Sequence, residues 1–321
     1  MKSIDIREVT PFLYGHCTDE ENGTGTTVII HETGAVGGVS VQGRAPGTRE
    51  TDLLKSENTV QNIHAVTLSG GSAFGLEAAG GVMNYLSERK IGFELLGNTI
   101  PIVPGAILFD FLPFSGDAWP DSSYGYEAAH QAFHRGNFAS GNAGAGTGAA
   151  VGKMKGYDSA MKGGFGSCAV EVNGLRVGAC IAVNAFGDII DPETGRIIAG
   201  ARENGSFLDT AKSIREMDPP DGAGGMNTTI GCITTNANIT KSEANHIASA
   251  AHDGLARCIR PVHTVMDGDA LFVMAGGEVD VSLLQLSALA VHVVEQAVLT
   301  AVRKATGAYQ LPAFQDLFKQ E

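Results

Sequence analysis

Runs of apolar residues bounded by glycine, proline and polar residues recur along the chain and predict β-strands. They occupy residues 64–68, 229–234 and 270–275, and residues 102–104 and 106–109 are expected to be extended segments. Residues 169–172 and 175–183 are also apolar, and they flank an Asn173-Gly174 pair. Because an Asn-Gly pair between alternating segments is a strong indication of a two-residue turn, these two segments are expected to form a β-hairpin.

Longer stretches carry apolar residues at intervals of three and four, the spacing of one face of an α-helix. Helices are expected at residues 73–89, 124–134, 241–258 and 281–304. Thr240 and Glu243 have the spacing of a capping box at the start of the third helix. Since strands and helices interleave without a regular βαβ alternation, the pattern predicts an α+β architecture with helices covering an extensive, largely antiparallel sheet.

Glycine is unusually abundant, with 43 glycines among 321 residues, close to twice the usual share of about 7%. It is densest in residues 141–153, where it argues against a helix and favours a strand with close backbone neighbours. A dinucleotide-binding loop is not favoured there, because no acidic residue is clearly placed further along the chain. A phosphate loop is excluded, because Thr147 and Met154 stand where that motif requires glycine and Ser or Thr.

The formal net charge of −13 and the absence of any basic tract argue against binding to a nucleic acid backbone. The five cysteines form no Cys-x-x-Cys pair and mostly lie in apolar runs, which indicates buried thiols in a reducing compartment and a cytoplasmic location. The first residues contain no signal-like apolar segment, and no apolar stretch is long enough to cross a membrane. Neither a secretory signal nor a membrane span is therefore expected.

The most informative junction joins a loop rich in proline and glycine, residues 218–223, to the strand at 229–234 through Asn227 and Thr228. A loop that places a hydroxyl residue at the start of a buried strand is compatible with a chain that cleaves its own backbone. The Thr228 hydroxyl would attack the Asn227 carbonyl, and hydrolysis of the ester would leave Thr228 with a nucleophilic oxygen and a free α-amine. That amine ordinarily has a pKa of about 7.7–8.0, so it is a base near neutral pH. The same residues also suit a plain turn into a strand.

Four further polar residues are candidates for a site. Asp267 and Asp269, separated by one glycine, enter an apolar strand, and two such carboxylates can hold a hydroxyl and an ammonium. Lys153 closes a run almost devoid of charge and suits either a surface position or a site cation. Asn184 ends an apolar strand, where its amide would form a turn or donate to an oxyanion. No His-Glu-x-x-His motif is present, and no metal or organic cofactor is expected.

Several segments, taken together, resemble a known family. They are Gly70-Gly71-Ser72-Ala73-Phe74-Gly75-Leu76-Glu77-Ala78, Ala143-Gly144-Ala145-Gly146 with Gly152-Lys153, the stretch around Asn184, Asn227-Thr228-Thr229-Ile230, and His263-Thr264 with Met266-Asp267-Gly268-Asp269-Ala270-Leu271-Phe272. The chain resembles the N-terminal-nucleophile-type amidases that include the nylon-oligomer hydrolases (6-aminohexanoate-oligomer endohydrolases). More distantly it is similar to the L-aminopeptidase/D-esterase and β-peptidyl aminopeptidase group. The resemblance covers roughly residues 25–305.

The resemblance implies a four-layer αββα fold of the N-terminal-nucleophile-hydrolase type, in one domain over residues 1–321. It further implies self-cleavage into residues 1–227 and 228–321, and assembly as a homo-oligomer, a tetramer in the family. The implied substrate is a small amide or peptide. Membrane and nucleic acid partners are not implied.

The resemblance also implies roles for single residues. Thr228 would be the nucleophile of both self-cleavage and hydrolysis. Asp267 and Asp269 would orient and stabilise Thr228. Lys153 would assist through proton transfer or charge stabilisation, and Asn184 would donate to the oxyanion.

Two departures from the nylon-oligomer hydrolase pattern concern the substrate. Phe74 stands where those enzymes carry tyrosine, so Phe74 is expected to shape substrate binding, and extra residues follow Lys153 at 156–161. Linear ω-amino-acid oligomers, peptides with a free N-terminus and D-amino-acid amides all remain open as substrates. Two other functions also remain open: acyl transfer of the ornithine acetyltransferase type, which shares the self-cleavage, and non-catalytic binding on the same fold.

Overall fold

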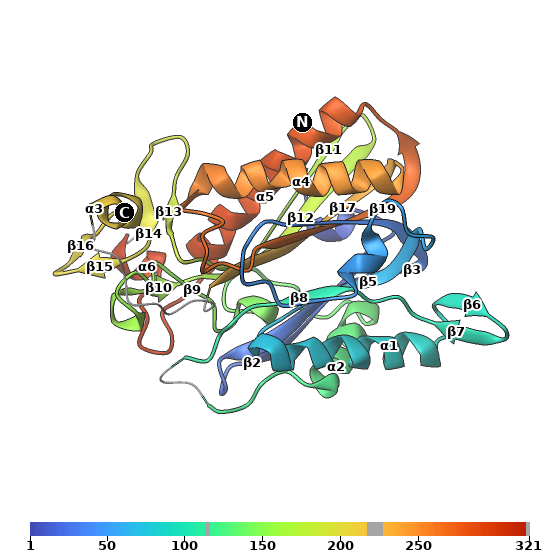
Figure 1. Ribbon diagram of the computed structural model, residues 1–321, viewed down its shortest axis with the longest axis horizontal. Coiled ribbons are helices and arrows are strands. Elements are labelled where there is room, and N and C mark those ends of the chain that lie inside the picture. Colours follow the sequence, from blue (N-terminus) through green and yellow to red (C-terminus); the bar gives the residue numbers. More distant parts are fainter. Residues whose placement is uncertain (113–115, 217–226, 319–321) are drawn as a thin grey trace.

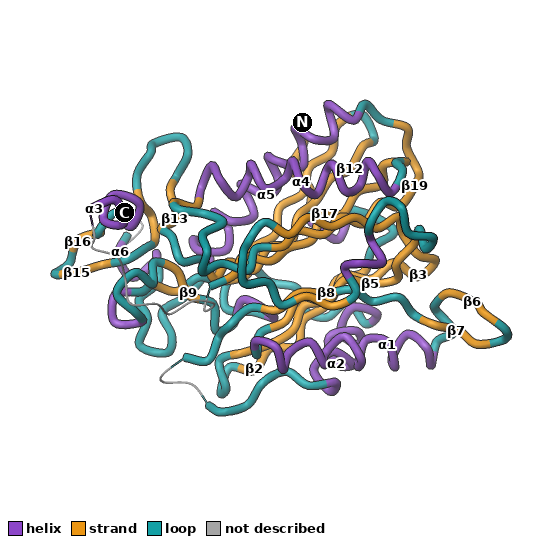
Figure 2. The backbone as a smooth tube through the Cα atoms, viewed as in Figure 1, coloured by secondary structure: helices purple, strands orange, loops and turns teal. Residues whose placement is uncertain are grey.

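The computed structural model describes residues 1–112, 116–216 and 227–318, so the loop at 218–223 lies outside the described residues. Two sheet layers lie face to face, with α4 (Lys241–Cys258) and α5 (Leu283–Lys304) over one and α1 (Ala78–Glu88) and α2 (Ser122–Phe133) over the other. Figure 2 shows the strands stacked between the two pairs of helices. The shorter helices α3 (Thr210–Glu216) and α6 (Phe314–Leu317) lie at one end of the sandwich.

Both sheet layers belong to one continuous hydrogen-bonded sheet of ten strands. In spatial order the strands are β1 (Lys2–Ile4), β11 (Gly164–Val172), β12 (Leu175–Asn184), β17 (Thr228–Asn238), β19 (Ala270–Asp280), β3 (Thr24–Val41), β5 (Asn62–Ser69), β8 (Gly105–Ile107) and β4 (Thr48–Arg49), with β2 (Leu13–Asp19) paired to β3. The pairs β17–β19 and β5–β8 are parallel, and the others are antiparallel. The first half of β3 pairs with β2 and β5 and its second half with β19, with a register shift between Ile30 and Ala35. The long strand β3 therefore carries the chain from one layer to the other.

Short strand groups complete the fold. Three are pairs: β6 (Phe93–Leu95) with β7 (Asn98–Ile100), β9 (Ala150–Val151) with β10 (Met161–Lys162), and β15 (Arg202–Glu203) with β16 (Ser206–Phe207). The fourth has three strands, with β13 (Asp188–Ile190) between β14 (Ile197–Ala199) and β18 (Ile259–Arg260).

Alternation along the central strands divides the core into three apolar layers. On β12, Ile181 and Val183 face α4 and α5, whereas Cys180 and Ala182 face the second sheet layer. On β3, Ile29 packs between the two sheet layers, and its neighbours Val28 and Ile30 pack with α1 and α2. Because side chains along a strand point alternately to opposite faces, each strand contributes to two of these layers. The four-layer αββα prediction is confirmed.

Most of the element predictions are confirmed. The helix at 241–258 forms as α4, and its capping box is present. The hairpin forms with Asn173 and Gly174 both at positive φ, as a tight two-residue turn requires. The helix expected at 73–89 begins instead as a 3-10 helix, Ser72–Glu77, and becomes α-helical at Ala78.

The strand predicted at 141–153 is wrong for most of its length. The segment contains the 3-10 helix Gly144–Gly146 and only the two-residue strand β9. Gly144 has φ of +51°, and a Cβ there would lie 2.3 Å from Nδ1 of His16. The glycines therefore let an irregular backbone pack against its neighbours, which extended geometry would not allow.

By length and hydropathy alone, α5 would be able to cross a membrane. In the fold it packs on β11, β12 and α4, and it contributes Leu286, Val293, Val294 and Val298 to the core. Its apolar character therefore has a structural explanation within the sandwich. The five cysteines are all free thiols.

Candidate active site

Thr228 is the first residue of β17, at the point where the strand enters the sandwich. It is 3% exposed, and the preceding Asn227 is 1% exposed. The Thr228 hydroxyl donates to the carbonyl oxygen of Asn227, and the Gly268 N–H donates to the same oxygen at 2.9 Å. A Cβ at position 268 would lie 2.8 Å from the Thr228 hydroxyl and 2.4 Å from the Ala45 carbonyl oxygen, so only glycine allows this approach. Two donors thus converge on the carbonyl of the predicted cleavage bond.

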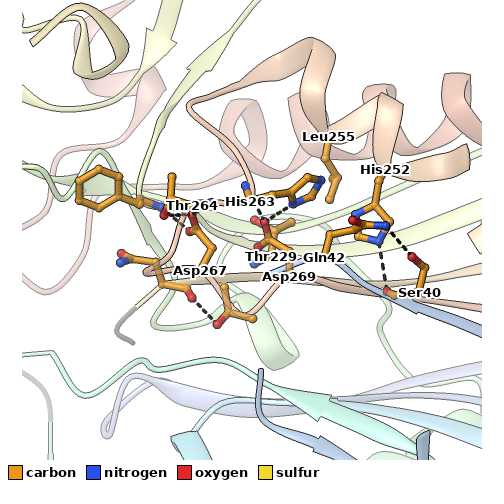
Figure 3. A network of polar contacts seen from close by, with 12 residues as sticks. Ser40, Gln42, Thr229, His252, Leu255, His263, Thr264, Asp267 and Asp269 are labelled. Atoms are coloured by element: carbon orange, nitrogen blue, oxygen red, sulfur yellow. Dashed lines mark hydrogen bonds and ion pairs between the residues drawn. The ribbon is translucent and has the colours of Figure 1, made fainter. Parts of the chain in front are cut away.

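Asp269 lies beside the peptide group that follows Thr228. Its carboxylate accepts from the Thr229 N–H at 2.6 Å and from Nδ1 of His263 at 2.7 Å. The His263 backbone N–H is a third donor at 3.3 Å. Figure 3 shows Asp269 between Thr229 and His263. Three donors fix the orientation of this buried carboxylate.

Asp267 lies beside the peptide group that precedes Thr228, and its backbone forms a parallel bridge with Asn227. Its carboxylate accepts from the Thr264 N–H at 2.9 Å, the Thr264 hydroxyl at 2.5 Å and the Phe186 N–H at 3.3 Å. Burial raises the pKa of Asp267, and the neighbouring Asp269 carboxylate raises it further. We call Asp267, Asp269, His263 and Thr264 the carboxylate side of the site.

The structure brings both aspartates beside Thr228 through backbone contacts. Within the described residues, neither carboxylate bonds to the Thr228 hydroxyl, whose partner is the Asn227 carbonyl. The aspartates instead hold the backbone on either side of Thr228.

Lys153 and Asn184 lie together on the opposite side. Asn184 is the partner of Thr228 in the β12–β17 pairing. The Lys153 ammonium donates to the Asn184 main-chain oxygen at 3.0 Å and to its side-chain oxygen at 2.8 Å. Burial lowers the pKa of Lys153 to about 7, although the carboxylates of Asp267 and Asp110 oppose this shift. The Asn184 amide nitrogen donates to the Phe109 carbonyl at 2.9 Å, so its oxyanion role requires an exchange of partners.

Two further buried charged residues, Asp110 and Lys162, lie close enough to Lys153 to influence its charge. Asp110 accepts from the Gly71 N–H at 2.7 Å and the Thr24 hydroxyl at 2.8 Å, and burial raises its pKa to about 6. Lys162 donates to the carbonyl oxygens of Thr147 and Ala149 at 2.9 and 2.7 Å, and burial lowers its pKa to about 7. We call Lys153, Asn184, Asp110 and Lys162 the lysine side of the site. On both sides of the site the charged groups are held by backbone and side-chain partners together.

Residues 5–311 match the model of peptidase family S58. The chain belongs to this family. It is 37% identical to an uncharacterized aminopeptidase of Mycobacterium tuberculosis, over 92% of this chain and 90% of that protein. It is 34% identical to a 6-aminohexanoate-oligomer endohydrolase of Paenarthrobacter ureafaciens, over 81% of this chain and 72% of that protein.

Solved structures of low sequence identity share the fold. A Burkholderia β-aminopeptidase superposes with a TM-score of 0.66 at 17% identity, covering 97% of this chain and 91% of that chain. An L-aminopeptidase D-Ala-esterase/amidase of Ochrobactrum anthropi, described as a variant of the Ntn hydrolase fold, superposes with a TM-score of 0.63 at 18% identity. It covers 94% of this chain and 86% of that chain. The resemblance stated from the sequence is confirmed, and this member of family S58 is a hydrolase that acts on amide bonds.

Several residues of this S58 site were missed from sequence. In the sequence, His263 stands out only as part of the segment 263–269. Its contact with Asp269, six positions further on, requires His263 itself to adopt a left-handed backbone conformation, with φ of 53°. The His252 ring lies edge-on to His263 at 4.7 Å, but nothing in the sequence distinguishes it from other helical histidines. Asp110 and Lys162 are lone charged residues near apolar segments, and no spacing pattern links them.

Phe74 lies apart from these buried residues. It is 58% exposed and stacks on Trp119 with ring centroids 4.6 Å apart. The 3-10 helix that carries it follows Gly71, whose N–H is held by Asp110. The lysine side is thus linked to the exposed aromatic pair. No cluster of three or more metal-ligating side chains occurs in the described ranges.

Proposed function

We propose that the chain cuts itself between Asn227 and Thr228, and that Thr228 then acts as the N-terminal nucleophile of amide hydrolysis. The observation that carries this proposal is the convergence on the Asn227 carbonyl oxygen. The attacking residue's own hydroxyl and the Gly268 N–H, at 2.9 Å, both donate to it. An N–H already aimed at this oxygen would stabilise the negative charge that develops there during attack.

In the self-cleavage step, the Thr228 oxygen forms a bond to the Asn227 carbonyl carbon while its proton leaves to a base. The C–N bond then breaks, the nitrogen takes a proton, and an ester joins the two residues. Water hydrolyses this ester, which leaves an Asn227 carboxylate and a free Thr228. Before cleavage the Thr228 nitrogen is an amide, which is not a base. Lys153, with a pKa lowered to about 7 by burial, is the base we propose for this step.

In substrate turnover, the free α-amine of Thr228 takes the hydroxyl proton and passes it to the leaving amine. An acyl-enzyme ester forms, and water releases the acyl group. Asp269 holds the Thr229 N–H and thereby fixes the residue that carries both reacting groups. Gly268 would donate to the substrate oxyanion, and Asn184 would join it after leaving the Phe109 carbonyl.

The proposed substrates are linear small amides or peptides. The named activities of the relatives support this class, since they include 6-aminohexanoate-oligomer endohydrolases and aminopeptidases. We also propose a single domain, a homo-oligomer and a cytoplasmic location, the last supported by five free thiols.

Competition between water and hydroxylamine for the acyl-enzyme tests the reaction type. The purified enzyme would be given an amide substrate with increasing hydroxylamine, and the acid and hydroxamate products would be measured by mass spectrometry. Hydrolysis predicts that the acid dominates when no added amine is present. An acid yield near zero without an added amine would instead indicate an acyltransferase.

A further inference from the structure

A cavity of about 190 Å³ lies beside the loop that follows Lys153. Its lining includes Leu112, Tyr157, Asp158, Arg202, Tyr309 and Leu311. One wall is the loop at 157–160, and another is strand β15, which carries Arg202. An ion pair between Lys155 and Glu203, at 2.7 Å, ties these two walls together.

The floor of the cavity is apolar. Leu112, Ala160 and Leu311 are buried in one small cluster, and the rings of Tyr157 and Tyr309 pack against it. Such a floor suits methylene groups rather than a fully polar ligand. At roughly 30 Å³ for each small group, the volume accommodates about six non-hydrogen atoms.

Two donors in the walls have no acceptor among the described residues. The Tyr157 hydroxyl oxygen is buried and has no hydrogen-bond partner among the described residues. Burial raises the pKa of Tyr157 to about 12, so the hydroxyl remains a donor at neutral pH. The half-buried Arg202 guanidinium takes part in no hydrogen bond or ion pair in the described part of the chain. Asp158 is the one carboxylate in the lining, and it is exposed.

We propose that this cavity is a substrate subsite for a carboxylate carried on a short apolar chain. Arg202 and Tyr157 would donate to the carboxylate, and the apolar floor would contact the methylene groups. The subsite rests on the proposed hydrolysis of linear amides, whose ends carry such carboxylates. The loop at 157–160 and strand β15, which line the cavity, would then help to determine which substrates the enzyme accepts.

Binding of butanoate to the wild-type protein tests the site, with butylamine as the probe of opposite charge. Ligand-observed NMR should detect butanoate and not butylamine. Arg202→Gln should weaken butanoate binding by about tenfold or more, because a hydrogen bond to a charged group contributes that much. Tyr157→Phe should weaken it a few-fold. Arg196→Gln, which removes an exposed arginine outside the cavity, should leave binding unchanged.

Equal binding of the two probes, or butanoate binding that survives Arg202→Gln, would overturn the proposal. Butanoate should also inhibit amide turnover competitively in the wild type and lose this effect in Arg202→Gln. Inhibition that is absent or purely noncompetitive would equally overturn it. The binding measurement involves no step at Thr228, so a failure of the subsite and a failure of the hydrolase proposal are read separately.

Discussion

The carboxylate side and the lysine side of the site hold their charges in different ways. Asp267 and Asp269 each accept several donors, and these come largely from the short segment that contains them. Lys153 is buried against the main-chain and side-chain oxygens of Asn184 and Lys162 against the carbonyl oxygens of Thr147 and Ala149, and burial lowers both pKa values to about 7. The hydrogen bonds of the carboxylate side fix the positions of its side chains. The lowered pKa values of the two lysines allow proton exchange near neutral pH. This difference fits the roles we propose, in which the carboxylates position Thr228 and a lysine moves its proton.

The largest effect on turnover is expected at Thr228, which lies between the carboxylate side and the lysine side. Thr228→Ala removes the attacking oxygen, so amide turnover should fall by about 10⁴-fold or more. Thr228→Ser keeps a hydroxyl and should retain part of the activity. Steady-state rates on one amide substrate would measure both. Substantial turnover by Thr228→Ala would place the nucleophile elsewhere.

Lys153→Met sharpens the role of the lysine side. The neutral amine is the base, so the rate of self-cleavage in the wild type should rise with pH through about 7 and then level off. Lys153→Met should slow cleavage by about 10²–10⁴-fold and remove this rise. Freshly translated chain, sampled over time from pH 5.5 to 9, would give the profile. If the substitution left the pH profile of self-cleavage unchanged, Lys153 would not be the base of this step.

Asp269→Asn tests the carboxylate side. The amide can still accept from Thr229, but the charge that pairs with His263 is lost. The turnover number should fall by about 10- to 100-fold, as expected for a charge-assisted hydrogen bond. Asp253→Asn, on the exposed face of α4, is the matched control and should have no effect. If the pH profile shifted while the maximal rate stayed the same, the positioning role would be wrong.

Asp110→Asn should have the smallest effect on turnover and a visible effect on stability. The folded pKa is about 6 and the unfolded one about 3.9, so the unfolded chain ionises first as the pH rises. Between pH 4 and 6, this group should lower the free energy of unfolding of the wild type by up to about 3 kcal/mol. Asp110→Asn should lack that decline. Urea unfolding across this range would measure the difference, and parallel curves for the two proteins would contradict it.

Two residues on each side could be named from the sequence, Asp267 and Asp269 on the carboxylate side and Lys153 and Asn184 on the lysine side. The strands at 229–234 and 270–275 are clear apolar runs in the sequence, and their parallel pairing sets Thr228 beside Asp267 and Asp269. The position of Lys153 depends on residues 141–153. The glycines there leave no alternation of apolar and polar residues, so packing alone decides the path of the backbone.

Long-range contacts were likewise hidden from the sequence. Asp110 meets Thr24 across 86 positions, a pairing that requires the finished sandwich. The left-handed turn at His263 was not predicted either, because a histidine seldom adopts it.

Intact-mass analysis of the purified protein tests the central claim most directly. The account predicts two pieces, residues 1–227 and residues 228–321, with Thr228 at the amino terminus of the smaller one. It also predicts that Thr228→Ala remains a single chain under the same conditions. An intact wild-type chain, or a Thr228→Ala protein that splits at the same bond, would contradict the account.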